Sequence, residues 1–250
     1  MSRSGATPGP GRQRLDQLLV ERGLADSRNK AQALVLAGQV FVDGEKAAKP
    51  GHAIAVTSRI ELAAPPPYVS RGGFKLAGAI ERFAIAVEGR VCLDVGASTG
   101  GFTDVLLQRG AARVYAVDVG AGQLDWKLRN DPRVTVREGL NARSLTPDDL
   151  GEAIDLAVCD VSFISVTLIL PAIASVLKET GEMVILVKPQ FEVGRGQVGK
   201  GGIVRDASLH SAVCEKVEQA VRYLNFVPET MESPILGAEG NREFLLYARH

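Results

Sequence analysis

The 250-residue chain lacks most of the features that announce a partner or a compartment. Basic and acidic residues both number 29, so the net charge is zero and any nucleic-acid surface must be local. The three cysteines are far apart and form no metal-ligand or redox pair, which indicates buried thiols in a reducing cytosol. No apolar run approaches the roughly 18 residues that span a bilayer. The polar opening MSRSGATPGPGRQR shows no secretory signal. We therefore expect a cytoplasmic monomer with no bound metal and no stable membrane association.

Composition divides the chain into a small and a large part. Residues 1–13 are rich in Gly, Pro, Ser and Arg, which predicts a disordered tail. Residues 14–62 contain two short helical patterns and then strand patterns around an Asp43-Gly44 turn, which predicts a compact α+β unit. The proline-rich residues 63–68 predict a stiff linker to the remainder of the chain.

Residues 69–250 alternate short apolar runs with amphipathic stretches. The runs are VCLDVG, RVYAVDVG, VTVRE, DLAVCDVSF and EMVILVKP. Such alternation predicts an α/β fold with a parallel, doubly wound sheet. In these sheets ligands bind beyond the carboxyl ends of the strands. We therefore look for the site among residues that directly follow these runs.

The first run ends in CLDVGASTGGF, an acidic, glycine-rich turn that leads into a helix. The second run ends at Asp118, about twenty residues on, where an acid can bind a ribose diol. Without the triple-glycine phosphate motif, these acids favour a cationic, phosphate-free nucleoside, S-adenosylmethionine, over a purely structural turn. The predicted cofactor-binding residues are Asp94, Gly96, Ala97, Ser98, Gly100, Phe102, Asp118, Val119 and Asp160.

Lys188 follows five apolar residues and precedes a proline, a costly place for a charge that has no use. Asp160 ends the preceding strand pattern, so both side chains are expected at one edge of the sheet. Lys75 and Glu243 could converge on them. Two neighbouring ammonium groups disfavour each other's charge, so one lysine could accept a proton from a substrate hydroxyl. Taken singly, Lys75 and Glu243 are better read as ordinary surface charges.

The motifs SRGGFKL, DVGASTGGFTD, DVSFIS, LVKPQFEVG and GNREF resemble the TlyA family of S-adenosylmethionine-dependent ribosomal RNA 2'-O-ribose methyltransferases, which have also been labelled haemolysins. The resemblance extends from about Arg14 to Arg249. It implies an S4-like RNA-binding domain in residues 14–62 and an FtsJ-like, Rossmann-type methyltransferase domain in residues 69–250. It also implies a catalytic tetrad, Lys75, Asp160, Lys188 and Glu243, in which the choice of the proton acceptor between the two lysines stays open.

The same resemblance implies ribosomal RNA within ribosomal subunits as the partner and a cytidine as the target. A single large-subunit cytidine is expected, with the small subunit open as an additional substrate. RNA contact must then come from local basic residues on the small unit and on the glycine-rich loop after Lys188. The predicted RNA-binding residues are Arg14, Arg22, Arg28, Lys30, Arg195 and Lys200.

Two other functions compete with this one. The chain could be a non-catalytic RNA-binding protein with a methyltransferase fold, although intact acids at both strand ends argue against that. It could also be a membrane-lytic protein, as the haemolysin label suggests, although no strongly basic amphipathic helix stands out.

Overall fold

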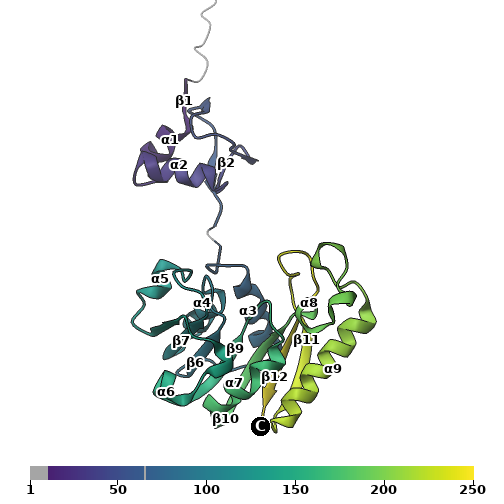
Figure 1. Cartoon of the computed structure of the whole chain (residues 1–250). Coiled ribbons are helices and arrows are strands. Elements are labelled where there is room, and N and C mark those ends of the chain that lie inside the picture. The colour runs from purple at the N-terminus through teal and green to yellow at the C-terminus, as the bar shows by residue number, and fades with distance from the viewer. Residues whose placement is uncertain (1–10, 65) are drawn as a thin grey trace, which may run out of the picture. The chain divides into compact units, whose positions relative to one another are not determined.

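The computed structural model describes residues 11–64 and 66–250. Most of the predicted tail, and Pro65 of the predicted linker, thus lie outside the described residues. The chain divides into two compact units, Met1–Pro67 and Tyr68–His250 (Figure 1).

The larger unit is built on one seven-stranded sheet. Its strands are β6 (Val91–Val95), β7 (Arg113–Asp118), β8 (Val134–Glu138), β9 (Ile154–Cys159), β10 (Leu177–Val187), β11 (Val227–Glu232) and β12 (Phe244–Arg249). Their order across the sheet is β11-β12-β10-β9-β6-β7-β8. The five strands from β10 to β8 are parallel, which confirms the predicted α/β class.

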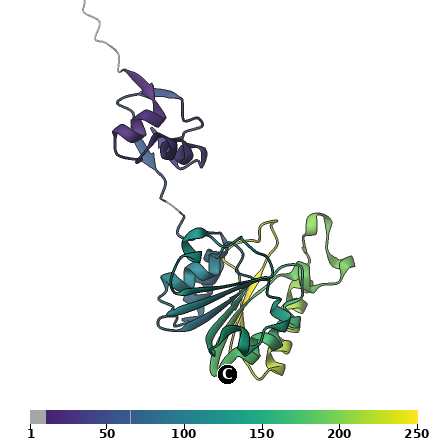
Figure 2. The ribbon, with the colours of Figure 1, turned by 60° about the vertical axis from the view of Figure 1, so that its left-hand side comes forward.

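Helices cover both faces of this sheet (Figure 2). They are α3 (Gly72–Phe83), α4 (Gly101–Gln108), α5 (Trp126–Arg129), α6 (Pro147–Leu150), α7 (Leu170–Val176), α8 (Pro189–Glu192) and α9 (Ala207–Tyr223). Alternate residues of β10 point to opposite faces. Val184 and Leu186 pack in the core under α3 and α4, whereas Met183, Ile185 and Val187 pack in the core under α7 and α9. Burial on both faces explains the continuous apolar run in this strand.

The last two strands depart from the expected parallel sheet. Strand β12 is antiparallel to both of its neighbours, β10 and β11, and lies between them. The reason is the connection, because residues 233–243 join β11 to β12 without a crossover helix, and such a link brings the chain back antiparallel. Strand β10 also begins before the apolar run EMVILVKP, because Leu177–Glu179 already belong to it.

The smaller unit has two short helices and five short strands around its own core. These are β1 (Arg12–Arg14), α1 (Leu15–Glu21), α2 (Arg28–Leu36), β2 (Val40–Val42), β3 (Glu45–Lys46), β4 (Ala53–Ala55) and β5 (Ile60–Leu62). Ser27 caps α2 by accepting a hydrogen bond from the backbone N–H of Lys30 at 3.2 Å. Asp43 and Gly44 form the predicted turn, both at positive φ, between β2 and β3.

The predicted disordered tail is too long at its C-terminal end. Arg12 and Gln13 belong to β1, where they pair with Ala55 and Ile54 of β4. The pairing joins residues more than forty positions apart, so local composition could not indicate it.

A buried carboxylate organises the basic residues of the smaller unit. Asp16 is fully buried. Arg14 donates to it from Nε and Nη2 at 3.0 and 2.9 Å, and Arg28 Nε and Gln32 Nε2 each donate to Oδ2 at 3.0 Å. The hydrogen bond from Arg14 contributes most to holding the pKa of Asp16 well below its usual range. Asp16 therefore links β1 and α1 to α2.

We expect Asp16→Ala to destabilise the smaller unit by about 1–3 kcal/mol, because the charge-assisted hydrogen bonds that Arg14 and Arg28 make to this buried carboxylate are lost. Hydrogen exchange of α1 and α2 in the full chain would measure this, with the exposed Asp26→Ala as control. Because the folded-state pKa is depressed, the stabilisation is present above the unfolded carboxyl pKa, near 4, and is lost as the pH falls below it. Equal exchange in both variants at neutral pH would contradict the role of Asp16.

Candidate active site

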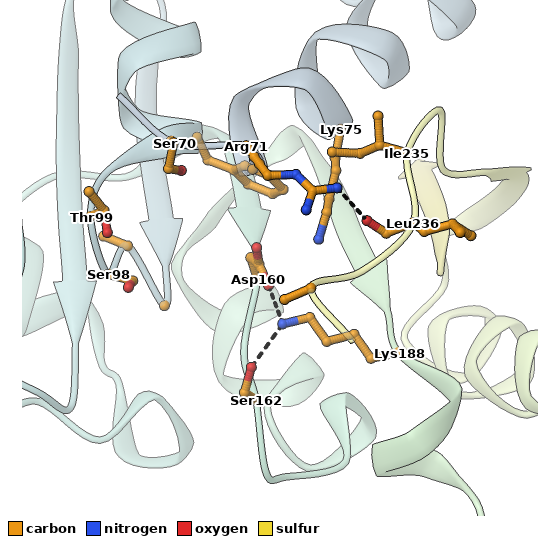
Figure 3. Close-up of a pocket in the computed structure, with 16 residues that line it drawn as sticks. Ser70, Arg71, Lys75, Ser98, Thr99, Asp160, Ser162, Lys188, Ile235 and Leu236 are labelled. Atoms are coloured by element: carbon orange, nitrogen blue, oxygen red, sulfur yellow. Dashed lines mark hydrogen bonds and ion pairs between the residues drawn. The ribbon is translucent and has the colours of Figure 1, made fainter. Parts of the chain in front are cut away.

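Lys188 and Asp160 meet because their strands are neighbours. Asp160 directly follows β9 and Lys188 directly follows β10, so both lie at the carboxyl edge of the sheet. Lys188 Nζ lies 2.5 Å from Asp160 Oδ1 and donates to Ser162 Oγ at 2.9 Å (Figure 3). The same ammonium lies 6.0 Å from the centre of the Phe191 ring. The lysine side chain is only 11% exposed, so these contacts replace most of its water.

Lys75 and Glu243 form a second buried ion pair. Lys75 projects from α3, and its Nζ lies 2.5 Å from Glu243 Oε2. Glu243 immediately precedes β12, whose first residue, Phe244, is paired with Val187 at the end of β10. The antiparallel direction of β12 thus brings Glu243 to the edge where Lys188 emerges. Gly237 passes so close that a Cβ there would lie 2.5 Å from Glu243 Oε1.

The two ion pairs border the same space. Lys75, Asp160 and Lys188 line one cavity of about 420 Å³ and project into it (Figure 3). A second cavity of about 420 Å³ is lined by Lys75, Lys188 and Glu243. The structure therefore brings together the four residues of the expected tetrad. Two ammonium groups, each held by a carboxylate, face a space that a polar substrate could enter.

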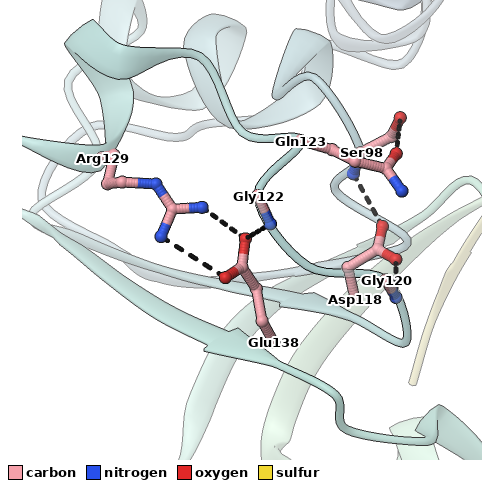
Figure 4. Close-up of polar contacts among 7 residues, drawn as sticks. All are labelled: Ser98, Asp118, Gly120, Gly122, Gln123, Arg129 and Glu138. Atoms are coloured by element: carbon pink, nitrogen blue, oxygen red, sulfur yellow. Dashed lines mark hydrogen bonds and ion pairs between the residues drawn. The ribbon is translucent and has the colours of Figure 1, made fainter.

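A third cavity, of about 510 Å³, lies beside the first and shares Gly96, Ser98, Asp160 and Ser162 with it. Asp118 is part of its wall. The Asp118 carboxylate accepts hydrogen bonds from the backbone N–H groups of Ser98 at 2.8 Å and Gly120 at 2.7 Å (Figure 4). These bonds fix the carboxylate while its remaining lone pairs stay available to a ligand.

The loop after Asp118 is braced by a second acid. Glu138 accepts a hydrogen bond from the backbone N–H of Gly122 at 2.8 Å and forms an ion pair with Arg129 (Figure 4). The backbone that carries the exposed Val119 is thus held from both sides. This bracing keeps one wall of the 510 Å³ cavity in place.

The turn between β6 and α4 passes very close to the end of β9. Gly96 has a φ of +82°, and a Cβ at this position would lie 2.4 Å from the carbonyl oxygen of Asp160. Any other residue would push the two strand ends apart. Gly96, which the sequence predicts as a cofactor-binding residue, is therefore also needed for the close approach of the turn to Asp160.

Asp94 lies in the protein interior at the end of β6. It is fully buried and accepts hydrogen bonds from Thr103 N at 2.9 Å and Thr103 Oγ1 at 2.6 Å, both to Oδ2. Its Oδ1 has no partner among the described residues. Burial raises the pKa of Asp94 to about 7, which the Thr103 hydrogen bonds oppose and the nearby Asp160 and Asp118 reinforce.

The other predicted cofactor residues fall into two groups. The 420 Å³ cavity that Asp160 borders is also lined by Gly96, Ala97, Ser98 and Phe102. The 510 Å³ cavity is lined by Val119 together with Asp118. Asp94 and Gly100 line neither of these two cavities as far as the structure describes them. The turn needs Gly100 for a different reason, because its φ is +98° and a Cβ would lie 2.3 Å from Leu128.

The predicted RNA-binding residues do not all present free charges. Arg14 and Arg28 are about half exposed and both bind Asp16. Arg22 donates to the carbonyl oxygens of Ser58 and Val56.

Two of the remaining predicted RNA-binding residues are exposed. They are Lys30 in α2 and Lys200 in the glycine-rich loop. The side chain of Arg195 lies outside the described part of the chain. The structure thus leaves fewer uncommitted cations than the sequence suggested.

Sequence reasoning missed several residues that line these cavities. Ser162 and Phe163 belong to the DVSFIS motif, and Arg71 belongs to SRGGFKL. Phe163 is 91% exposed with a φ of +66°, a conformation that aromatic residues rarely adopt. Asn141 lines the 510 Å³ cavity and follows β8 without any recognisable motif. The motifs themselves were the available signal for the first three.

Comparisons with known proteins agree with this geometry. The FtsJ-like methyltransferase family matches residues 68–250, and the S4 domain matches residues 13–60. The 16S/23S rRNA (cytidine-2'-O)-methyltransferase TlyA of Mycobacterium tuberculosis is 51% identical over 241 residues, which cover 95% of this chain and 90% of that protein.

Two further relatives cover nearly the whole chain. Hemolysin A of Brachyspira hyodysenteriae is 46% identical over 94% of this chain and 98% of its own length. A solved structure from Streptococcus thermophilus, described as a hemolysin, is 47% identical with a TM-score of 0.73, covering 96% of this chain and 88% of that chain.

The Asp94 carboxyl should titrate near pH 7 in the cofactor-free protein. Because its folded-state pKa is raised, the bound proton stabilises the fold fully below about pH 4, and this stabilisation is lost as the pH rises through about 7. Chemical denaturation should therefore show that the wild type loses stability between pH 5 and pH 8, by roughly 1–3 kcal/mol more than Asp94→Asn. The exposed Asp148→Asn is the control. Identical pH dependence in wild type and Asp94→Asn would show that Asp94 is already ionised at pH 5.

Proposed function

The chain belongs to the TlyA family of FtsJ-like methyltransferases, and from this membership we propose that it methylates the ribose 2'-oxygen of a cytidine in ribosomal RNA. The observation that carries the proposal is the meeting of two lysine–carboxylate pairs at the edge of the sheet where cavities adjoin. Burying an ammonium group is costly unless a carboxylate is placed beside it. Two such nearly buried pairs at one site favour a catalytic protein over a methyltransferase fold without activity.

The larger of these cavities fits S-adenosylmethionine. Its wall includes the acids Asp118 and Asp160, and the braced Asp118 carboxylate suits the two hydroxyls of a ribose. The Asp94 oxygen that has no partner lies in the interior and lines neither this cavity nor the cavity bordered by Lys75, Asp160 and Lys188. Acids rather than a phosphate cradle suit a ligand that carries positive charge and no phosphate. When bound, the cofactor would supply an electrophilic methyl group on a sulfonium that is already a good leaving group.

We assign the proton of the ribose hydroxyl to Lys188. Its amine would accept or steer that proton, which would make the 2'-oxygen a better nucleophile. Asp160 holds the lysine and borders the cofactor cavity, and Lys75 and Glu243 position the ribose. Much of the rate would come from orientation, because all four side chains are fixed by partners before the substrate arrives.

The smaller unit would supply RNA recognition, in line with its S4-domain match. Arg14 and Arg28, held as a pair by Asp16, present half-exposed guanidinium groups that suit phosphates. The substrate would be an assembled ribosomal subunit, with a large-subunit cytidine as the first candidate, and the enzyme would act as a monomer in the cytoplasm. None of the helices in the described part of the chain has the length and apolar character that crossing a bilayer requires.

Substituting Lys188 tests the proposed chemistry. We expect Lys188→Ala to fold and to bind cofactor and RNA, yet to transfer methyl at least ~100-fold more slowly, the usual scale for losing a general base. Lys188→Arg should fail almost as badly, since a guanidinium keeps its charge and cannot accept the proton. Single-turnover transfer of labelled methyl to ribosomal subunits would measure both variants.

Lys178→Ala is the matched control, because Lys178 lies in β10, the strand that Lys188 follows, is 43% exposed and pairs with Asp155 away from the site. Its rate should equal that of the wild type. A near-wild-type rate for Lys188→Arg would show that only a fixed positive charge is needed and would remove the general-base assignment.

Deleting residues 1–62 tests the division of labour between the units. Cofactor affinity, measured by calorimetry, should stay within about twofold, because all cavity-lining acids lie in the larger unit. RNA affinity should fall at least tenfold, with a shallower dependence on salt, because phosphate contacts are lost. Full methyl transfer to intact subunits by the truncated protein would refute a role of the smaller unit in recognition.

A further inference from the structure

Ser162 lies where all three cavities meet. Among the described residues it is the only one that lines the 510 Å³ cavity and both 420 Å³ cavities. Methyl transfer requires that the methyl donor and the acceptor oxygen approach along one line, which can happen only where their two cavities join. A group at this junction is therefore next to the reacting atoms.

The backbone around Ser162 is held in an unusual shape. The N–H of Asp160 donates to the carbonyl of Val95 at 2.9 Å, which ties the start of the turn to β6. Phe163 then adopts a left-handed φ of +66°, and the centre of its ring lies 5.2 Å from the centre of the Phe191 ring. Backbone strain at a bulky residue persists only where surrounding contacts over-determine it. The hydrogen bond of Asp160 and the ring contact of Phe163 lie on either side of Ser162, whose Oγ lies 2.9 Å from Lys188 Nζ.

In the hydrogen bond between Lys188 and Ser162, the lysine nitrogen donates and the serine oxygen accepts. An ammonium has three N–H groups, and a neutral amine has two N–H groups and one lone pair. Asp160 Oδ1 lies 2.5 Å from Lys188 Nζ, and Ser162 Oγ accepts a hydrogen bond from the same nitrogen at 2.9 Å. Two of the three positions around Nζ are therefore assigned, and only the third is left for a substrate.

With Asp160 as its only acceptor, the amine could rotate about the Cε–Nζ bond and point its lone pair in either of two directions. The second acceptor removes that freedom. Removal of rotational freedom before the reaction is one of the larger sources of rate in enzymes. Ser162 is thus suited to act on the lysine rather than on the substrate.

We propose that Ser162 is a positioning residue for Lys188 that aims the lone pair of its amine at the ribose 2'-hydroxyl. The inference rests on the proposed function. As the 2'-oxygen forms its bond to the methyl carbon, the carbon–sulfur bond breaks and the hydroxyl proton passes to Lys188 Nζ. The products are a 2'-O-methyl ribose, a neutral thioether and a Lys188 ammonium whose three N–H groups face Asp160, Ser162 and the product.

The kinetic test combines Ser162→Ala with Lys188→Ala. Ser162→Ala should slow single-turnover methyl transfer to ribosomal subunits about tenfold, less than the loss of the base itself, with the dissociation constants of cofactor and RNA within twofold of wild type. In the Lys188→Ala background, the same change should have no further effect, because Ser162 acts through Lys188. The exposed Ser211→Ala in α9 is the control and should react at the wild-type rate.

Two kinetic outcomes would overturn the proposal. A wild-type rate for Ser162→Ala would remove the role, and a second tenfold loss in the Lys188→Ala background would show that Ser162 acts on substrate or cofactor directly.

A second measurement does not depend on activity. Nitrogen-15 NMR of the lysine side chains in the cofactor-free protein should show the Lys188 signal change in Ser162→Ala while the Lys178 signal stays in place. If the wild type transferred no methyl group to ribosomal subunits, the proposed function would fail, and this measurement would still decide whether the contact exists. An unchanged Lys188 signal would refute the inference itself.

Discussion

The site depends on the pairing of two nearly buried lysines with two carboxylates. A buried ammonium without a partner would cost several kcal/mol, so Lys75 needs Glu243 and Lys188 needs Asp160. These four residues come from α3, the end of β9, the end of β10 and the start of β12. The pairs can form only if these elements arrive in one register, which makes the charged site a product of the sheet order.

The topology of the sheet meets this requirement through β12. Had the last strand run parallel to β10, Glu243 at its start would lie at the opposite edge of the sheet, far from Lys188. Its antiparallel insertion between β10 and β11 brings the acid to the carboxyl edge. Close backbone contacts complete the arrangement, since Gly96 lies against the Asp160 carbonyl and Gly237 lies against the Glu243 carboxylate, where a Cβ would collide.

Much of this could be predicted from the sequence, and the failures share one cause. Apolar runs predicted the strands, and the run before Lys188 correctly indicated a covered strand end. No local pattern indicated an antiparallel β12, so the place of Glu243 came only from a family resemblance. The pairing of Arg14 and Arg28 with Asp16 was equally invisible, because it joins residues of β1, α1 and α2 in three dimensions. Ser162 lay within a noted motif, but its contact with Lys188 depends on strand order.

Ion pairs within the fold also limit the number of cations that this chain, which has no net charge, can offer to RNA. Many opposite charges among the described residues are paired within the fold, including Arg90 with Glu182 and Arg133 with Asp131. Matched charges contribute little to a long-range field, so attraction to RNA must come from few, local cations. Few phosphate contacts give modest affinity and a shallow salt dependence. Specificity would then depend less on electrostatic strength than on whether a ribose can reach the junction of the cavities at Lys188, where we propose that the methyl donor and the lysine amine are oriented for transfer.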